Sequence, residues 1–201
     1  MGPSVGTREA WRRGRKQYAV WLFRVRSAAV QQRARDVIAA LGDTIRPTPL
    51  DDLHVTLFVA GFPTDHPQLD DDVAEATLHE QRRALASAQF SGFTLTIGSA
   101  NAFASAPFLE VQGDIEPIRQ VLIAASSQPE IRFSDYRPHL TLGVFQDSGP
   151  IWPVQQTLAR FRTASPIHVG IGGIELVTFD ARIAGSRLET RWTITAPFDP
   201  R

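Results

Sequence analysis

Short apolar runs recur along the whole chain, and their spacing separates predicted strands from predicted helices. Continuous or alternating apolar runs predict strands over residues 18–25, 53–59, 93–97, 108–112, 138–144, 167–179 and 187–196. Apolar residues three or four positions apart predict helices over residues 27–41, 70–89, 115–126 and 152–161. We expect the second helix to begin at the three aspartates 70–72, because the helix dipole favours negative charge there. The last two strands are expected to form a hairpin.

The order of these elements predicts a duplicated α+β arrangement. Each half contains helices and strands, and one strand in each half carries a histidine inside an apolar run. No linker rich in Gly, Ser or Pro separates the halves, so we predict one bilobal domain over residues 18–201. Residues 1–17 are basic and contain Gly and Pro. They are predicted to form a flexible tail, with a nucleic-acid-binding arm as the alternative.

Two of the predicted strands contain nearly the same tetrapeptide, His-Val-Thr-Leu at residues 54–57 and His-Leu-Thr-Leu at residues 139–142. The chain has only five histidines, so a chance match at both +2 and +3 is hard to accept. Side chains alternate between the two faces of a strand, which puts His and Thr of each copy on one face. Each strand therefore offers an imidazole and a hydroxyl on one side and an apolar surface on the other.

Charge and composition narrow the classes of function. The 201 residues include 21 basic and 21 acidic side chains, so the formal net charge is zero. The chain therefore lacks the overall positive charge that is typical of proteins that bind long nucleic acids. The absence of cysteine excludes disulfides, thiolate metal sites and a cysteine nucleophile. No apolar stretch approaches the length of a membrane span, and no signal-peptide pattern is seen. We therefore expect a cytoplasmic protein that does not bind membranes.

The polar side chains of the repeat are His54, Thr56, His139 and Thr141, and they suit acid–base chemistry on a phosphate. Two facing imidazoles, one neutral and one protonated near pH 7, form an acid–base pair. Such a pair can open a cyclic phosphodiester, because one imidazole activates water while the other protonates the leaving oxygen. The threonine hydroxyls can hydrogen-bond the non-bridging phosphate oxygens. Side chains handle every proton, so no cofactor is required.

Residues just before the second motif extend the candidate site. Arg137 lies two positions before His139, and Pro138 favours an extended backbone at residue 137, which aligns the two side chains on one face. A guanidinium there could clamp a phosphate, or Arg137 could be an ordinary surface residue. Tyr136 and Phe133 could stack on a nucleobase or simply pack the loop.

Other chemistries find less support. A metal held by His54 and His139 would need further ligands, and the nearby carboxylates Asp51 and Asp52 do not make a familiar ligand spacing. We therefore predict no metal. The chain also lacks a G-x-S-x-G nucleophile elbow, a phosphate loop of the G-x-x-x-x-G-K-[ST] type and a G-x-G-x-x-G motif.

The paired His-x-Thr-Leu motifs resemble those of the 2H phosphoesterase superfamily. Residues 46–61 and 133–142 look like its LigT-type branch, the RNA 2',3'-cyclic phosphodiesterases or 2'-5' RNA ligase-like proteins, and the resemblance covers roughly residues 18–198. It implies a bilobal α+β fold in which two antiparallel sheets line a central groove, with helices outside. The two motif histidines would then face each other across that groove, with the motif threonines on the phosphate.

The resemblance also implies an activity, the metal-independent opening of 2',3'-cyclic phosphates to 2'-phosphates. By analogy His54 is the general acid and His139 the base, an order that the residues themselves do not set. Members of this branch often carry Arg three residues after the second motif Thr, where this chain has Val144. Arg137 is the candidate replacement, or the substrate differs, as in a branch that acts on cyclic phosphates of nucleotides or ADP-ribose.

These inferences predict an enzyme, a monomeric hydrolase that acts on RNA with a 2',3'-cyclic phosphate end or on a cyclic nucleotide. Two alternatives use the same residues. The first is a binding module that recognises RNA ends or nucleotides without turnover. The second is 2'-5' RNA ligation, in which the same acid–base pair runs in the reverse direction.

Overall fold

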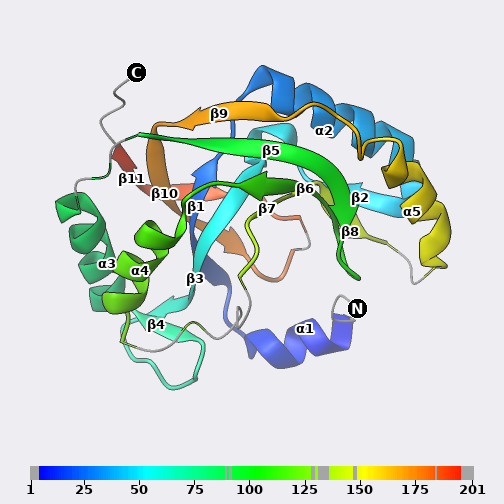
Figure 1. Cartoon of the computed structure of the whole chain (residues 1–201). Helices are drawn as coiled ribbons and strands as arrows, with labels where there is room; N and C mark the ends of the chain where they lie inside the picture. Colours follow the sequence, from blue (N-terminus) through cyan, green and yellow to red (C-terminus); the bar gives the residue numbers. More distant parts are fainter. Residues whose placement is uncertain are drawn as a thin grey trace.

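The structure is a computed structural model that describes residues 5–88, 90, 92–127, 130, 136–146, 149–183 and 185–195 (Figure 1). Its helices are α1 (Val5–Arg12), α2 (Ala28–Leu41), α3 (Glu75–Ser87), α4 (Glu116–Ala124) and α5 (Ile151–Ala159), with 3-10 turns η1 (Gly42–Thr44) and η2 (Leu50–Asp52). Its strands are β1 (Gln17–Arg24), β2 (Ile45–Pro47), β3 (His54–Thr64), β4 (Asp72–Ala74), β5 (Phe93–Ala102), β6 (Pro107–Gln112), β7 (His139–Thr141), β8 (Gly143–Phe145), β9 (Ile167–Ile171), β10 (Gly173–Asp180) and β11 (Glu189–Thr195). No helix among these described residues is long and apolar enough to cross a membrane.

One large, curled sheet organises the fold. Within the described residues it has nine strands, in the order β11-β10-β1-β3-β7-β6-β5-β9, with β4 added in parallel beside β3. A second sheet consists of only β2 and β8. The predicted α+β class is confirmed, but the expected pair of separate sheets is replaced by a single one. The reason is that the two motif strands, β3 and β7, hydrogen-bond directly to each other and join the halves.

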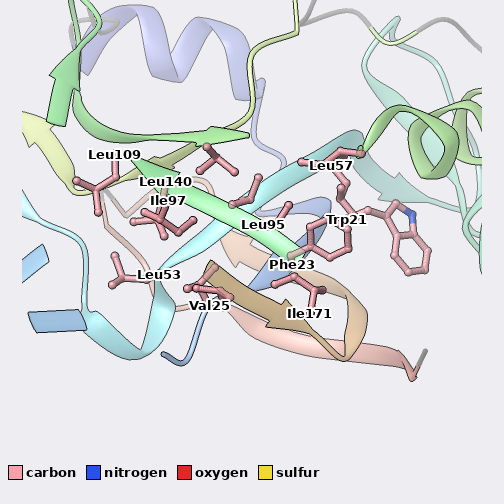
Figure 2. Close-up of a cluster of buried hydrophobic side chains, with 14 of the residues drawn as sticks. Trp21, Phe23, Val25, Leu53, Leu57, Leu95, Ile97, Leu109, Leu140 and Ile171 are labelled. Carbon is pink, nitrogen blue, oxygen red and sulfur yellow. The ribbon is translucent and has the colours of Figure 1, made fainter. Parts of the chain in front are cut away.

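The main apolar core contains side chains from the sheet and from helices α2, α3, α4 and α5. Side chains from β1 and β3 in the first half pack with side chains from β5, β6, β7 and β9 in the second, as Figure 2 shows for Trp21, Phe23, Leu57, Leu95, Leu140 and Ile171. The apolar residues of both motifs, Val55, Leu57, Leu140 and Leu142, are fully buried. Burying a side chain of this size stabilises the fold by about 1.5–3 kcal/mol, so packing holds both motif strands in place.

The helices form two groups. Helix α2 packs near α5, and helix α3 packs near α4 (Figure 1). Helix α2 begins at Ala28 after an extended Ser27 and buries the stripe of Val30, Ala34, Val37 and Leu41, as its apolar spacing predicts. Gly42 follows with a positive φ of 53° and ends this helix, a conformation that glycine adopts without strain.

Three sequence predictions about local structure are wrong. The run 138–144 is divided into β7 of the large sheet and β8 of the small sheet. The apolar run 167–179 is two strands separated at Gly172: β9 pairs with β5 at one edge of the sheet, whereas β10 pairs with β1 and β11. The hairpin of β10 and β11 is confirmed. The aspartates 70–72 do not begin helix α3, which starts at Glu75. Arg15 instead binds the carboxylates of Asp71 and Asp72 at 2.6 and 2.5 Å, which stabilises the turn into β4.

The segment predicted as a tail contains helix α1, and the side chain of Trp11 within it lies against the sheet. Helix α1 ends at Arg12, and Trp11 packs against Tyr18 and Phe62, each at a ring-centroid distance of 5.0 Å. These rings belong to a second apolar cluster on the face of the sheet opposite the main core. The N-terminal helix therefore covers part of the sheet face that also carries the motif side chains.

Candidate active site

The two motifs lie side by side in the sheet. Val55 of β3 pairs with Leu140 of the antiparallel strand β7, and both side chains point into the core. Their neighbours along each strand therefore point to the opposite face. In this antiparallel register, His54 stands opposite Thr141, and Thr56 stands opposite His139. The structure thus gathers His54, Thr56, His139 and Thr141 on one face, all partly exposed.

Two rows of side chains cross four neighbouring strands at this point. One row contains Arg24, His54, Thr141 and Phe108, and the next contains Leu22, Thr56, His139 and Glu110. The two imidazoles occupy diagonal positions, which in an antiparallel sheet are separated by about 7–8 Å. A phosphate can lie between two side chains at that spacing. The outer neighbours of the histidines differ in charge, because Arg24 stands beside His54 and Glu110 stands beside His139.

The ring of His54 is held by the backbone that precedes it. Its Nδ1 lies 2.7 Å from the carbonyl oxygen of Asp52. Because a carbonyl oxygen only accepts hydrogen bonds, Nδ1 carries the hydrogen and Nε2 is left to exchange protons with a substrate. Turn η2 is itself fixed, since Asp52 is buried and its carboxylate accepts a hydrogen bond from Arg24 at 2.9 Å. Arg24 also donates to Glu175 at 3.0 Å.

His139 has the same arrangement in the second motif. Its Nδ1 lies 2.7 Å from the carbonyl oxygen of Arg137, again two residues earlier. Two aromatic rings pack against the imidazole edge-to-face, Phe103 at a centroid distance of 4.9 Å and Phe108 at 5.6 Å. Both histidines therefore present Nε2, and each is oriented by a backbone carbonyl, as repeated motifs would predict.

The environment of His54 favours a neutral imidazole. Burial lowers the pKa of His54, and the positive charges of Arg24 and His139 lower this pKa further. The hydrogen bond to the Asp52 carbonyl and the carboxylate of Asp52 act in the opposite direction. The electrostatic effect of His139 on His54 agrees with the close approach of the two rings that the strand register gives.

A charged network lies beside the first motif strand and connects it to the chain that leads into the second motif. Arg119 donates to the carbonyl of Leu57 and, at 2.8 Å, to Glu130, whose carboxylate accepts the Val59 amide at 3.0 Å. The Arg119 guanidinium also stacks 3.7 Å from the centre of the Tyr136 ring. Burial raises the pKa of Tyr136, so its hydroxyl stays protonated. That hydroxyl donates to the Thr56 carbonyl at 2.6 Å.

Tyr136 and Phe133 were the two residues that the sequence suggested for stacking on a nucleobase. The hydroxyl of Tyr136 and one face of its ring are engaged within the protein, which favours packing over stacking on a substrate. Phe133 lies outside the described residues. The aromatic pair that contacts a motif histidine, Phe103 with Phe108, was missed by sequence reasoning. In the sequence, Phe103 lies within the connection between the predicted strands 93–97 and 108–112, and Phe108 begins the second of these strands.

Two arginines lie on segments next to the second motif, Arg137 before it in the chain and Arg46 on the strand that pairs with β8. Arg137 is exposed, and its carbonyl orients His139. Val144 pairs with Arg46 across the small sheet, next to the pair of Ile45 and Phe145. Because Ile45 and Phe145 pack towards the core, Arg46 and Val144 point away from it. A guanidinium therefore stands across from the position where arginine was expected, and Arg46 joins Arg137 as a candidate phosphate ligand.

The other three histidines lie elsewhere. His79 packs against the ring of Trp192 at 4.8 Å, and His168 lies 3.2 Å from the hydroxyl of Thr96 on the outer strands. His66 is exposed in the loop before β4. In the part of the chain that the structure describes, no group of three or more His, Cys, Asp or Glu side chains is arranged to hold a metal ion.

A cavity of about 510 Å³ adjoins this face at the end of β1. Its lining includes Arg24, Arg26, His168 and Glu175, together with Gly172 at the β9–β10 junction. The cavity shares Arg24 with the row that contains His54.

The curled sheet and the adjacent His-x-Thr strands define a class of protein, the LigT-like 2H phosphoesterases. The chain belongs to this group: a family model described as the 2'-5' RNA ligase superfamily matches residues 24–182. The predicted resemblance is thereby confirmed. No curated protein sequence matches the chain significantly.

Solved structures with the same fold agree with this assignment. LigT from E. coli, crystallised with 3'-AMP, is 15% identical with a TM-score of 0.65, and the match covers 90% of this chain and 99% of that one. The protein TT0787 from Thermus thermophilus is 13% identical with a TM-score of 0.66, covering 91% and 100%. A structure described as a phosphoesterase is 16% identical with a TM-score of 0.63, covering 89% and 98%. At these identities the similarity establishes the fold.

Proposed function

We propose that this protein is a metal-independent phosphodiesterase that opens 2',3'-cyclic phosphates at RNA ends or on nucleotides. One observation carries the proposal: two imidazoles and two threonine hydroxyls share one face of two hydrogen-bonded strands. Each imidazole is oriented through Nδ1 by a backbone carbonyl at 2.7 Å. An acid–base pair of this kind suits a reaction in which one oxygen is deprotonated and another is protonated.

The reaction balances with these groups alone. The neutral imidazole takes a proton from water at Nε2, and the water oxygen attacks the phosphorus. The bond from phosphorus to the 3' oxygen breaks, and the protonated imidazole gives its Nε2 proton to that oxygen. The product is a 2'-phosphate with a free 3'-hydroxyl. Thr56 and Thr141 hydrogen-bond the non-bridging oxygens, whose negative charge grows during attack. Arg137 or Arg46 adds a positive charge.

The surroundings of the histidines favour His54 as the base and His139 as the acid, the reverse of the order taken by analogy. The lowered pKa of His54 keeps its Nε2 unprotonated near neutral pH. Glu110 stands opposite His139 in the register, whereas Arg24 stands opposite His54. After one turnover His54 carries the extra proton and His139 has lost one. Proton exchange with water then restores both histidines to their starting states.

The family and a structural relative support this proposal for the substrate class. E. coli LigT has been crystallised with 3'-AMP and with phosphate. A nucleotide ligand for a protein of this fold supports nucleotides, or the terminal nucleotide of an RNA, as the ligands here. We propose that the cavity next to Arg24 accepts the rest of an RNA strand.

The test uses purified protein treated with EDTA, incubated with adenosine 2',3'-cyclic phosphate and with an oligoribonucleotide that ends in a 2',3'-cyclic phosphate. Phosphorus NMR distinguishes the 2'-phosphate from the 3'-phosphate. We expect turnover to the 2'-phosphate, and a loss of about 10²- to 10⁴-fold in His54→Ala and His139→Ala. His66→Ala is the matched control and should keep full activity, because His66 is exposed in the loop before β4. Absence of hydrolysis of every cyclic phosphate, or full activity in both motif variants, would overturn the proposal.

The same experiment decides between hydrolysis and the two alternatives. A binding module would retain the cyclic phosphate unchanged while binding it, and the histidine variants would lose no rate. A ligase would join the cyclic phosphate end to a 5'-hydroxyl oligonucleotide added to the mixture, giving a longer product. Hydrolysis is expected to dominate because water is the more abundant nucleophile.

A further inference from the structure

An aromatic pair forms one wall of the site beside His139. Phe108 belongs to β6 and stands opposite Thr141 in the register, on the motif face of the sheet. Phe103 lies in the turn between β5 and β6, and its ring stacks on Phe108 with a centroid distance of 4.2 Å and an interplanar angle of 23°. The edge of the His139 imidazole meets both rings. An aromatic surface therefore lies beside the second motif imidazole.

The two phenylalanines differ in how far they are covered. Phe108 is 8% exposed and is part of the buried interior. Phe103 is only partly buried, so its ring still reaches solvent next to the imidazole. A partly exposed aromatic ring beside polar site residues costs solvation free energy unless a ligand covers it. This difference marks Phe103 as the ring that a ligand can contact.

The turn that carries Phe103 is held in place at both ends. The Phe103 amide donates to the Ala106 carbonyl at 2.9 Å, which closes the turn. The Phe145 amide of β8 donates to the Ser105 carbonyl at 3.0 Å, which ties the turn to the second motif segment. Ordering a ring before a ligand arrives lowers the entropy cost of binding. Phe103 is therefore preorganised at a fixed position relative to His139.

We propose that Phe103, supported from behind by Phe108, is the platform on which the substrate's nucleobase stacks. This proposal rests on the proposed function. The base of a nucleoside 2',3'-cyclic phosphate is attached next to the carbon that bears the 2' oxygen, so a phosphate between the imidazoles leaves the base within one ribose of the site. A phenylalanine ring recognises every base through its π-face. The substrate class is then a base-bearing cyclic phosphate of any sequence, with purines favoured over pyrimidines by their larger ring area.

The experiment compares two substrates in wild-type protein and in Phe103→Ala. One is adenosine 2',3'-cyclic phosphate, and the other is the base-free analogue methyl ribofuranoside 2,3-cyclic phosphate. For the nucleoside substrate we expect kcat/KM to fall about 5- to 150-fold, the equivalent of one stacked base. The loss should appear mainly in KM, because stacking is the same in the ground state and the transition state. For the base-free substrate the rate should be unchanged.

Two further variants separate stacking from a structural role. Phe103→Trp should retain or improve the nucleoside rate, since it keeps an aromatic face. Phe108→Leu, which removes the ring behind Phe103 and against His139, should reduce kcat for both substrates alike. If Phe103→Ala lowers the rate of both substrates equally, Phe103 only positions His139 and the platform is refuted. An unchanged nucleoside rate refutes it as well.

Equilibrium binding keeps this test independent of turnover. Adenosine 3'-monophosphate and ribose 3-phosphate are titrated by calorimetry into wild-type protein and into Phe103→Ala. The platform predicts that the adenosine ligand binds more tightly to wild type and that the variant loses this advantage. If wild-type protein hydrolyses neither cyclic phosphate but shows this pattern of binding, the proposed function fails and the platform stands. Equal affinities of wild type and variant for the adenosine ligand refute the platform.

Discussion

Replacing Arg119 by Met should destabilise the protein strongly, because it leaves a buried carboxylate without its partner. The side chains of Arg119 and Glu130 are each 5% exposed and lie 2.8 Å apart. Arg119 also donates to the Leu57 carbonyl, and Glu130 accepts the Val59 amide, so both charges are tied to β3. Methionine keeps much of the apolar stem but none of the donors.

The expected loss is about 3–5 kcal/mol, the usual cost of removing one partner of a buried ion pair. A domain of this size has roughly 5–15 kcal/mol of stability in total, so the variant should be marginal. Its melting temperature should fall by about 6–20 °C, at roughly 2–4 °C per kcal/mol. Removing the second charge in Arg119→Met/Glu130→Gln should recover part of the loss, since the glutamine oxygen can still accept the Val59 amide.

Urea unfolding followed by circular dichroism measures these differences. The matched control is Arg83→Met, which breaks an ion pair with Glu80 whose side chains are 74% and 55% exposed, and it should change stability little. A loss of stability below about 1 kcal/mol in Arg119→Met would refute the view that the Arg119–Glu130 network stabilises β3. A double variant less stable than the single one would refute the view that the uncompensated carboxylate is the main cost.

Other predictions concern the site and its supports. Gly143→Ala should destabilise by about 1–3 kcal/mol, because a Cβ there would lie 2.5 Å from the Arg46 carbonyl oxygen, whereas Gly149→Ala, with open space around it, should be nearly neutral in the same urea experiment. Tyr136→Phe should lose about 0.5–1.5 kcal/mol through the missing bond to the Thr56 carbonyl, and unchanged stability would contradict that bond. In a pH profile of kcat/KM, activity that needs neutral His54 should persist below pH ~6.5 and be lost only as the pH falls through the lowered pKa. The free energy of unfolding should also decrease as the pH falls from ~6.5 to the lowered pKa of His54, because in this range the unfolded chain binds more protons than the folded one. An acidic limb at or above pH ~6.5 would indicate that a group other than His54 is the base.

The faces of the motif strands could be predicted from the sequence because alternation is a local property. Val55 and Leu140 are buried while the histidines beside them are partly exposed, as period-two spacing requires. The pairing of β3 with β7 could not be predicted in the same way. It joins segments that are far apart in the chain, and the alternation of each strand is equally compatible with two separate sheets.

The supports of the site also escaped prediction, for a related reason. Asp52 was considered only as a metal ligand, because its partner Arg24 lies at the end of a distant apolar strand and nothing local connects them. Arg119 sits within an ordinary helical pattern, and its burial against β3 is a tertiary feature. The run 167–179 looked like one strand because both parts are apolar. Only the pairing of each part with a different strand shows the break at Gly172.

Joining both halves in one sheet has a mechanical consequence. In a protein whose two lobes meet across a hinge, the gap between catalytic groups changes as the lobes open and close. Here the gap is set by the ladder between β3 and β7, with a strand spacing of about 4.7–4.9 Å, and widening it would break backbone hydrogen bonds. We therefore expect the backbones that carry the two histidines to keep one separation whether or not a ligand is present. Selection for substrate size must come from the turns and side chains around the rim, and the amides of Val55 and Leu140 should be among the slowest to exchange with solvent.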